Sequence, residues 1–79
     1  MGISAEERHK MLAVRLCGPR VIERLESIGV RRLADLADRD AFDLVEEVNI
    51  AAGRRIWSPP MATTAMANLI AAARQQPTG

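Results

Sequence analysis

The sequence lacks the residues on which disulfide-bonded, metal-binding and membrane-spanning proteins depend. Its 79 residues include one cysteine, which excludes an intramolecular disulfide, and one histidine. Cys17 and His9 together fall short of the four ligands of a structural zinc site. No stretch approaches the roughly 20 apolar residues that cross a bilayer, and no long apolar run follows the first charges. We therefore expect no metal, no cofactor and no membrane partner, and a cytoplasmic location.

Aromatic residues are also scarce, because the chain has one Phe, one Trp and no Tyr. It has instead 13 alanines with several Leu, Ile and Val, a composition that suits closely packed helices better than β-sheets. A chain of this length has room for one hydrophobic core. We therefore expect an all-α fold, a compact bundle of about five short helices. It should form one domain over residues 1 to 76, with residues 77 to 79 as a disordered tail.

Charge is unevenly distributed although its total is only +1. Residues 1 to 32 carry seven basic and four acidic side chains, a net charge of +3, whereas residues 33 to 47 carry six acidic side chains and one basic, a net charge of −5. Residues 48 to 79 add three arginines and no acid. Either basic segment could face a phosphate backbone, although a solvated helix face is the simpler interpretation.

Two helices are predicted in the first 30 residues. Ser4 followed by Glu7 fits a capping box, which predicts a first helix over residues 5 to 16, ended by a Gly-Pro pair. The second helix covers residues 20 to 28 and ends at Gly29, a residue suited to a left-handed cap. Its apolar residues follow one helical stripe: Val21, Ile22, Leu25 and Ile28.

Three further helices are predicted from periodicity and caps. A short one covers Leu33 and Leu36, and the next is capped by Asp38 or Asp40 and stopped by a glycine at position 53. The apolar face of that acidic helix is predicted to be Ala41, Phe42, Leu44, Val45 and Val48. The last helix starts at Ser58, an N-cap before a proline, and runs to about residue 75. Its core stripe is predicted to be Met61 or Ala62, then Ala65, Met66, Leu69, Ile70 and Ala73.

Residues 15 to 30, Arg-Leu-Cys-Gly-Pro-Arg-Val-Ile-Glu-Arg-Leu-Glu-Ser-Ile-Gly-Val, resemble a helix-hairpin-helix motif, in which a tight glycine hairpin joins two helices. The spacing that carries the resemblance is met by Gly18, Ile22, Leu25, Gly29 and Val30. The motif would span about residues 5 to 29. The continuation over residues 29 to 36, with an acidic helix from residue 40, resembles the small bacterial "pathogenicity locus" group of helix-hairpin-helix proteins.

The resemblance implies sequence-independent binding of double-stranded DNA by backbone N–H groups of the hairpin. Unpaired N–H groups at the positive end of a helix dipole can hold a phosphate without any side chain. The implied contacts come from the backbones of Leu16, Gly18, Arg20 and Val21, with Arg20 and Arg24 adding charge. Leu16 replaces the first glycine of the motif, and the proline after Gly18 removes one N–H group. A hairpin with a purely structural role is the alternative.

Catalytic groups are missing from the sequence at usable spacings. Cys17 and His9 are eight residues apart, about 12 Å of helical rise, so they cannot act as nucleophile and base. Cys17 is better explained as a small buried hydrophobe. The acids of residues 35 to 47 lack the spacing of a calcium loop and are read as a solvated face. We therefore expect a binding module rather than an enzyme.

The segment around Trp57 is the second candidate binding site. Trp57 follows Arg54 and Arg55, and Trp and Arg are both enriched at binding hot spots. The indole could stack on a base or anchor a protein partner, while a plug for the core is the favoured interpretation. An alternative function to DNA binding is therefore protein interaction or self-association through the acidic helix and this loop.

Overall fold

The predicted all-α architecture is confirmed for residues 2–58 and 61–76, which are the residues that the computed structural model describes. These residues form four α-helices and one 3-10 turn, and none of them is in a strand. The elements are α1 (Ala5–Leu12), α2 (Pro19–Ser27), η1 (Leu33–Leu36), α3 (Ala41–Ala52) and α4 (Met61–Arg74). The segment predicted as a short third helix is thus a single 3-10 turn.

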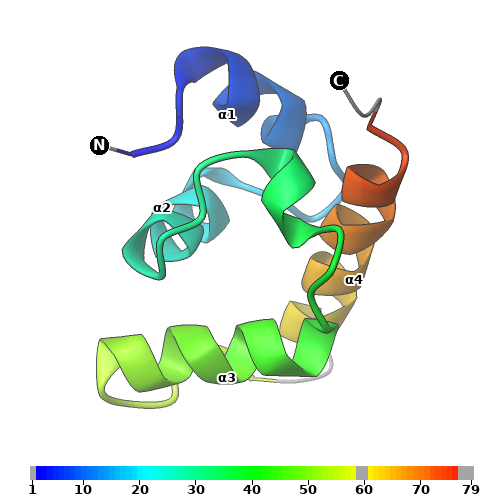
Figure 1. Cartoon of the computed structure of the whole chain (residues 1–79). Helices are drawn as coiled ribbons and strands as arrows, with labels where there is room; N and C mark the ends of the chain where they lie inside the picture. The colour runs from blue at the N-terminus through cyan, green and yellow to red at the C-terminus, as the bar shows by residue number, and fades with distance from the viewer. Residues whose placement is uncertain (1, 59–60, 77–79) are drawn as a thin grey trace.

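The helices are arranged around α2 and η1. Helix α1 lies at one end of the molecule and α3 crosses the other, while α4 runs along one side from α3 toward α1 (Figure 1). After α3 the chain reverses and runs back along that helix before α4 begins (Figure 1). The Cα radius of gyration of 11.5 Å is that of a compact chain of this length. No helix in the described part of the chain is both long and apolar enough to cross a membrane.

Helix α1 begins where it was predicted and ends four residues early. Ser4 Oγ accepts a hydrogen bond from the N–H of Glu7 at 3.2 Å, as an N-cap should. The other half of the capping box is wrong, because the Glu7 carboxylate accepts instead from the N–H of Leu33, 2.9 Å away in η1. After Leu12 the α-helical hydrogen bonds give way to turns: the N–H of Val14 donates to the carbonyl of Met11 at 3.0 Å, and the N–H of Cys17 donates to that of Val14 at 3.1 Å. Leu16, with a left-handed φ of 70°, completes the reversal of the chain.

Helix α2 ends in a Schellman motif, as the position of Gly29 predicted. Gly29 has φ of 90°, and its N–H donates to the carbonyl of Glu26 at 3.0 Å. The N–H of Val30 donates to the carbonyl of Leu25 at 3.1 Å, and both side chains are buried. Gly53, with φ of 75°, closes α3 in the same way.

Helix α3 is capped by Asp40, whose carboxylate accepts from the backbone N–H groups of Phe42 and Asp43. The prediction that Phe42 faces the core is wrong, since its side chain is 65% exposed. With 3.6 residues per turn, Phe42 lies about 100° around the helix from Ala41 and falls outside the buried stripe. That stripe consists of Leu44, Val45 and Val48.

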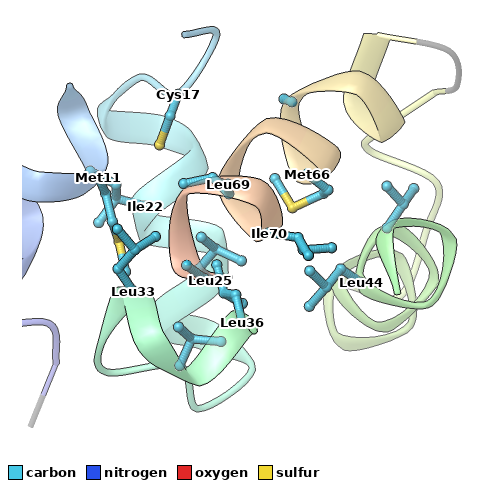
Figure 2. Close-up of a cluster of buried hydrophobic side chains, with 14 residues drawn as sticks. Met11, Cys17, Ile22, Leu25, Leu33, Leu36, Leu44, Met66, Leu69 and Ile70 are labelled. Atoms are coloured by element: carbon cyan, nitrogen blue, oxygen red, sulfur yellow. The ribbon is translucent and has the colours of Figure 1, made fainter. Parts of the chain in front are cut away.

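The core is formed by apolar side chains from every helix, which converge between α2, η1 and α4 (Figure 2). The predicted stripe of α4 is confirmed, with Ala62 half-buried and Met61 71% exposed. The carbonyl of Ser58 accepts from the N–H of Ala62 at 3.4 Å. The proline predicted at the first helical position and the predicted tail, residues 77 to 79, lie outside the described residues.

Candidate nucleic-acid interface

The turn between α1 and α2 places backbone N–H groups at the start of α2. Gly18 is the N-cap, with an extended backbone, and its carbonyl accepts from the N–H groups of Val21 and Ile22 at 3.1 and 3.3 Å. The Val21 N–H is therefore already used inside the turn. In the described part of the chain, the N–H groups of Leu16, Gly18 and Arg20 have no protein acceptor. Three of the four implied backbone contacts are thus available to an anion.

The two basic segments that the sequence separates by 30 residues meet in one place. Arg20 and Arg24 of α2 line a pocket of about 480 Å³ together with Arg54 and Arg55, which follow α3. Ile56 and Trp57 complete the lining, and no acidic side chain is among the described residues that line it. The structure therefore brings Arg20 and Arg24 of the first predicted set together with Arg54, Arg55 and Trp57 of the second, on a surface that we call the arginine pocket. Gly18, also predicted as a contact, lines neither this pocket nor the one described below.

These four arginines differ from most other basic residues of the chain. Ion pairs join a basic residue to a carboxylate at Arg8–Glu26, Lys10–Glu7, Arg32–Asp35 and Arg39–Glu47. By contrast, within residues 2–58 and 61–76 none of the guanidinium groups of the arginine pocket has an ion pair or hydrogen bond to the protein. Four exposed guanidinium groups without an ion-paired carboxylate thus surround one pocket.

A second pocket adjoins the first. It has a volume of about 270 Å³ and is lined almost entirely by apolar side chains: Leu16, Val21, Ile56, Trp57, Met61, Ala62, Ala65 and Met66, with Ser58. Ile56 and Trp57 line both pockets and so form the wall between them. Trp57 is half-buried against the core and lines both pockets. Leu16 and Val21, predicted as DNA contacts, line this second pocket, which we call the apolar pocket.

Asn49 of α3 holds the Trp57 segment in place. Its Oδ1 accepts from the N–H groups of Ile56 and Trp57 at 3.0 and 2.9 Å. Its Nδ2 donates to the carbonyl of Trp57 at 3.1 Å. One amide side chain thus satisfies three backbone groups of an otherwise irregular segment. Sequence reasoning missed Asn49, because one polar residue on a helix carries no periodic signal.

Asn68 of α4 fixes the backbone of the turn between α1 and α2 in a similar way, with one hydrogen bond. Its Nδ2 donates to the carbonyl of Arg15 at 3.1 Å, which ties the turn before Leu16 to helix α4. The chain separation of 53 residues explains why no local pattern pointed to this contact. The turn before α2 and the Trp57 segment are therefore both fixed by asparagines on helices, one 53 residues away and the other 8 residues away.

Cys17 is buried, as predicted, with its sulfur directed into the core (Figure 2). Burial raises the pKa of its thiol to about 11, so the residue is neutral and unreactive near pH 7. His9 is exposed on α1. The acidic residues serve local roles: Asp40 caps α3, and Asp35 accepts from the N–H groups of Arg31 and Arg32. No group of three possible metal ligands occurs in the described part of the chain.

Two carboxyl groups have shifted pKa values. The backbone N–H of Leu33, followed by Lys10, holds the pKa of Glu7 below its ordinary value. Partial burial alone would raise the pKa of Asp35, but the N–H groups of Arg31 and Arg32 together lower it. Both carboxylates accept hydrogen bonds at η1 and line neither pocket, so their ionisation affects the stability of the fold.

No protein-family model, curated protein or solved structure matches this chain.

Proposed function

We propose that the chain is a non-catalytic module that binds the DNA backbone weakly and without sequence preference. In this proposal α1, the turn and α2 act as a helix-hairpin-helix, and the arginine pocket supplies the charge. The observation that carries the proposal is the meeting of Arg20, Arg24, Arg54 and Arg55 around one pocket without a carboxylate. Guanidinium groups fork onto phosphate oxygens, and exposed cations without counterions release condensed ions from DNA on binding.

The hairpin adds uncharged donors beside Arg20. The N–H groups of Gly18 and Arg20 lie at the positive end of α2 and that of Leu16 lies two residues before its N-cap, and the three have no acceptor in the described part of the chain. Such donors bind phosphate without reading the base sequence. Contacts of both kinds would give affinity that does not depend on sequence and that falls steeply with salt.

The test is a titration of a fluorescent DNA duplex at several salt concentrations, combined with NMR mapping of the amides. We expect the logarithm of the binding constant to fall linearly with the logarithm of the salt concentration. Replacing Arg54 and Arg55 by Gln should reduce that slope by about 1.8, because each lost phosphate contact removes about 0.9.

The matched control is the double variant of Arg31 and Arg32 to Gln. It removes the same charge from another exposed pair of neighbouring arginines that does not line the pocket. A similar loss of affinity in both double variants would refute the assignment to the arginine pocket. Absence of any shift near residues 15 to 24 or 54 to 57 on adding DNA would refute the proposed function.

Exposed apolar side chains on the acidic helix support a second candidate function, self-association or binding of a protein. Phe42 and Ile50 are 65% and 76% exposed, and Glu46 lies between them at helical spacing. Exposed aromatic and aliphatic groups with charged neighbours are typical of protein contacts. Sedimentation of the Phe42→Ser variant against the original chain tests this: a concentration-dependent mass that the substitution abolishes supports it, and a monomer at all concentrations refutes self-association.

A further inference from the structure

We infer that the apolar pocket receives an unpaired base of a DNA strand whose phosphates lie on the arginine pocket. This inference rests on the proposed function and adds a preference for strands with unpaired bases. It follows from the position of Trp57, which lines the cationic and the apolar pocket at once. No other described side chain except Ile56 lines both.

Each of the two pockets suits one part of a nucleotide, the phosphate or the base. The arginine pocket offers four guanidinium groups to the anionic backbone. The apolar pocket offers Trp57 among aliphatic side chains, and within its described lining only Ser58 and the indole N–H of Trp57 provide polar side-chain groups. Proteins that bind single strands combine a cationic track for phosphates with aromatic side chains on which bases stack. A pocket with so few polar groups cannot read base edges, so binding remains independent of sequence.

A duplex cannot fill the apolar pocket. Paired bases stack on their neighbours and expose only their edges in the grooves, so their faces cannot contact Trp57. An unpaired base has a free face and pays little unstacking energy. Three hydrogen bonds from Asn49 fix the backbone of residues 56 and 57 before any ligand binds, so Trp57 is held in a segment that already lines both pockets.

The sequence provides its own reporter, because Trp57 is the only tryptophan and the chain has no tyrosine. The experiment compares three DNA ligands of equal length at one salt concentration: a single strand, the same strand with abasic sites, and a duplex. We expect the single strand to quench the fluorescence of Trp57 and to bind about tenfold or more tightly than the abasic strand. The duplex should bind without quenching.

A substitution that fills the apolar pocket provides a second test of the inference. Ala62→Leu places a larger side chain in the apolar pocket, and Ala51→Leu makes the same change at an exposed site on α3 that lines neither pocket. We expect Ala62→Leu to lower affinity for the single strand to that of the abasic strand while the duplex affinity is unchanged. If Ala62→Leu fails to fold, the comparison of abasic and intact strands with the original protein still tests the inference.

The outcomes separate this inference from the proposed function. Equal binding of all three ligands, without quenching, overturns the base pocket and leaves DNA binding in place. Binding of none of them removes the proposed function and this inference together. A peptide of alternating Leu and Asp that quenches Trp57 where the single strand does not would assign the pocket to a protein partner and would also overturn the inference.

Discussion

Replacing Asn49 by Ala tests how far one side chain determines the shape of the interface. The amide of Asn49 makes three hydrogen bonds to the backbone of Ile56 and Trp57, with lengths of 2.9 to 3.1 Å. In the variant, two N–H groups and one carbonyl lose their partner. Each such bond contributes about 1 kcal/mol net, so the loss is about 3 kcal/mol. The better helix propensity of Ala returns about 0.5 kcal/mol of this loss.

The expected destabilisation is therefore about 2 to 3 kcal/mol, or a fall in Tm of roughly 10 to 20 °C for a domain of this size. Urea unfolding followed by circular dichroism measures the free energy. Hydrogen exchange by NMR should show lost protection at the amides of Ile56 and Trp57 before the rest of the chain opens.

Asn68→Ala is the matched control, since it removes a single exposed hydrogen bond to the carbonyl of Arg15. We expect it to cost no more than about 1 kcal/mol. If Asn49→Ala is no more destabilising than Asn68→Ala, or if the amides of residues 56 and 57 keep their protection, the reasoning about this anchor is wrong.

Three more predictions concern pH, reactivity and backbone conformation. The pKa of Glu7 is lower in the folded than in the unfolded chain, so its carboxylate stabilises the fold at neutral pH, and this stabilisation is lost as the pH falls below about 5. Glu7→Gln should therefore weaken the pH dependence of the free energy of unfolding between about pH 7 and 3. An unchanged dependence would contradict this. Burial raises the pKa of Cys17 to about 11, against an ordinary value near 8.5. In the folded chain at about pH 8 this thiol should therefore react with a thiol reagent roughly a hundredfold more slowly than in the chain unfolded by urea. Equal rates would show that the thiol is accessible. Gly29→Ala should cost about 1 kcal/mol because φ is 90°. Gly18→Ala should cost only about 0.5 kcal/mol: its backbone is extended and a Cβ there meets no atom within 4 Å, so the loss arises because alanine is a poorer N-cap than glycine. Urea unfolding of both variants checks the difference.

Local signals predicted most of the helices because the relevant interactions are short in sequence. Ser4, Asp40, Gly29 and Gly53 act within four residues of the helix ends that they define, and a single sequence displays such spacings. The buried stripe of α4 was equally legible, because a period of 3.6 residues is visible without any knowledge of the neighbours.

The predictions that were wrong depend on packing and contacts that a short stretch of sequence does not show. Phe42 looked like a core residue because it is aromatic, and only the direction of the buried stripe of α3 shows that it faces outward. Helix α1 ends early in turns over residues 13 to 17, which include a left-handed Leu16, a conformation that is rare for a residue with a Cβ. Glu7 fitted a local cap but serves a contact 26 residues away, which no local pattern reveals.

The candidate site was predicted as two separate pieces. The residues around α2 were predicted from the resemblance to a helix-hairpin-helix motif and those around Trp57 from their residue types. Their meeting in one pocket depends on how α2 and α3 pack. The asparagines that fix these segments gave no signal, because hydrogen bonds across 8 or 53 residues cannot be read from spacing.

Gathering four guanidinium groups without counterions has a thermodynamic consequence for the folded chain itself. The two arginines of α2 and the two that follow α3 come together only in the folded chain, so we expect their repulsion to lower its stability. Any polyanion that neutralises the pocket should return that stability through linkage. Sulfate or phosphate should therefore raise the melting temperature more than chloride at equal ionic strength, beyond the stabilisation that these anions give proteins in general by exclusion from the surface.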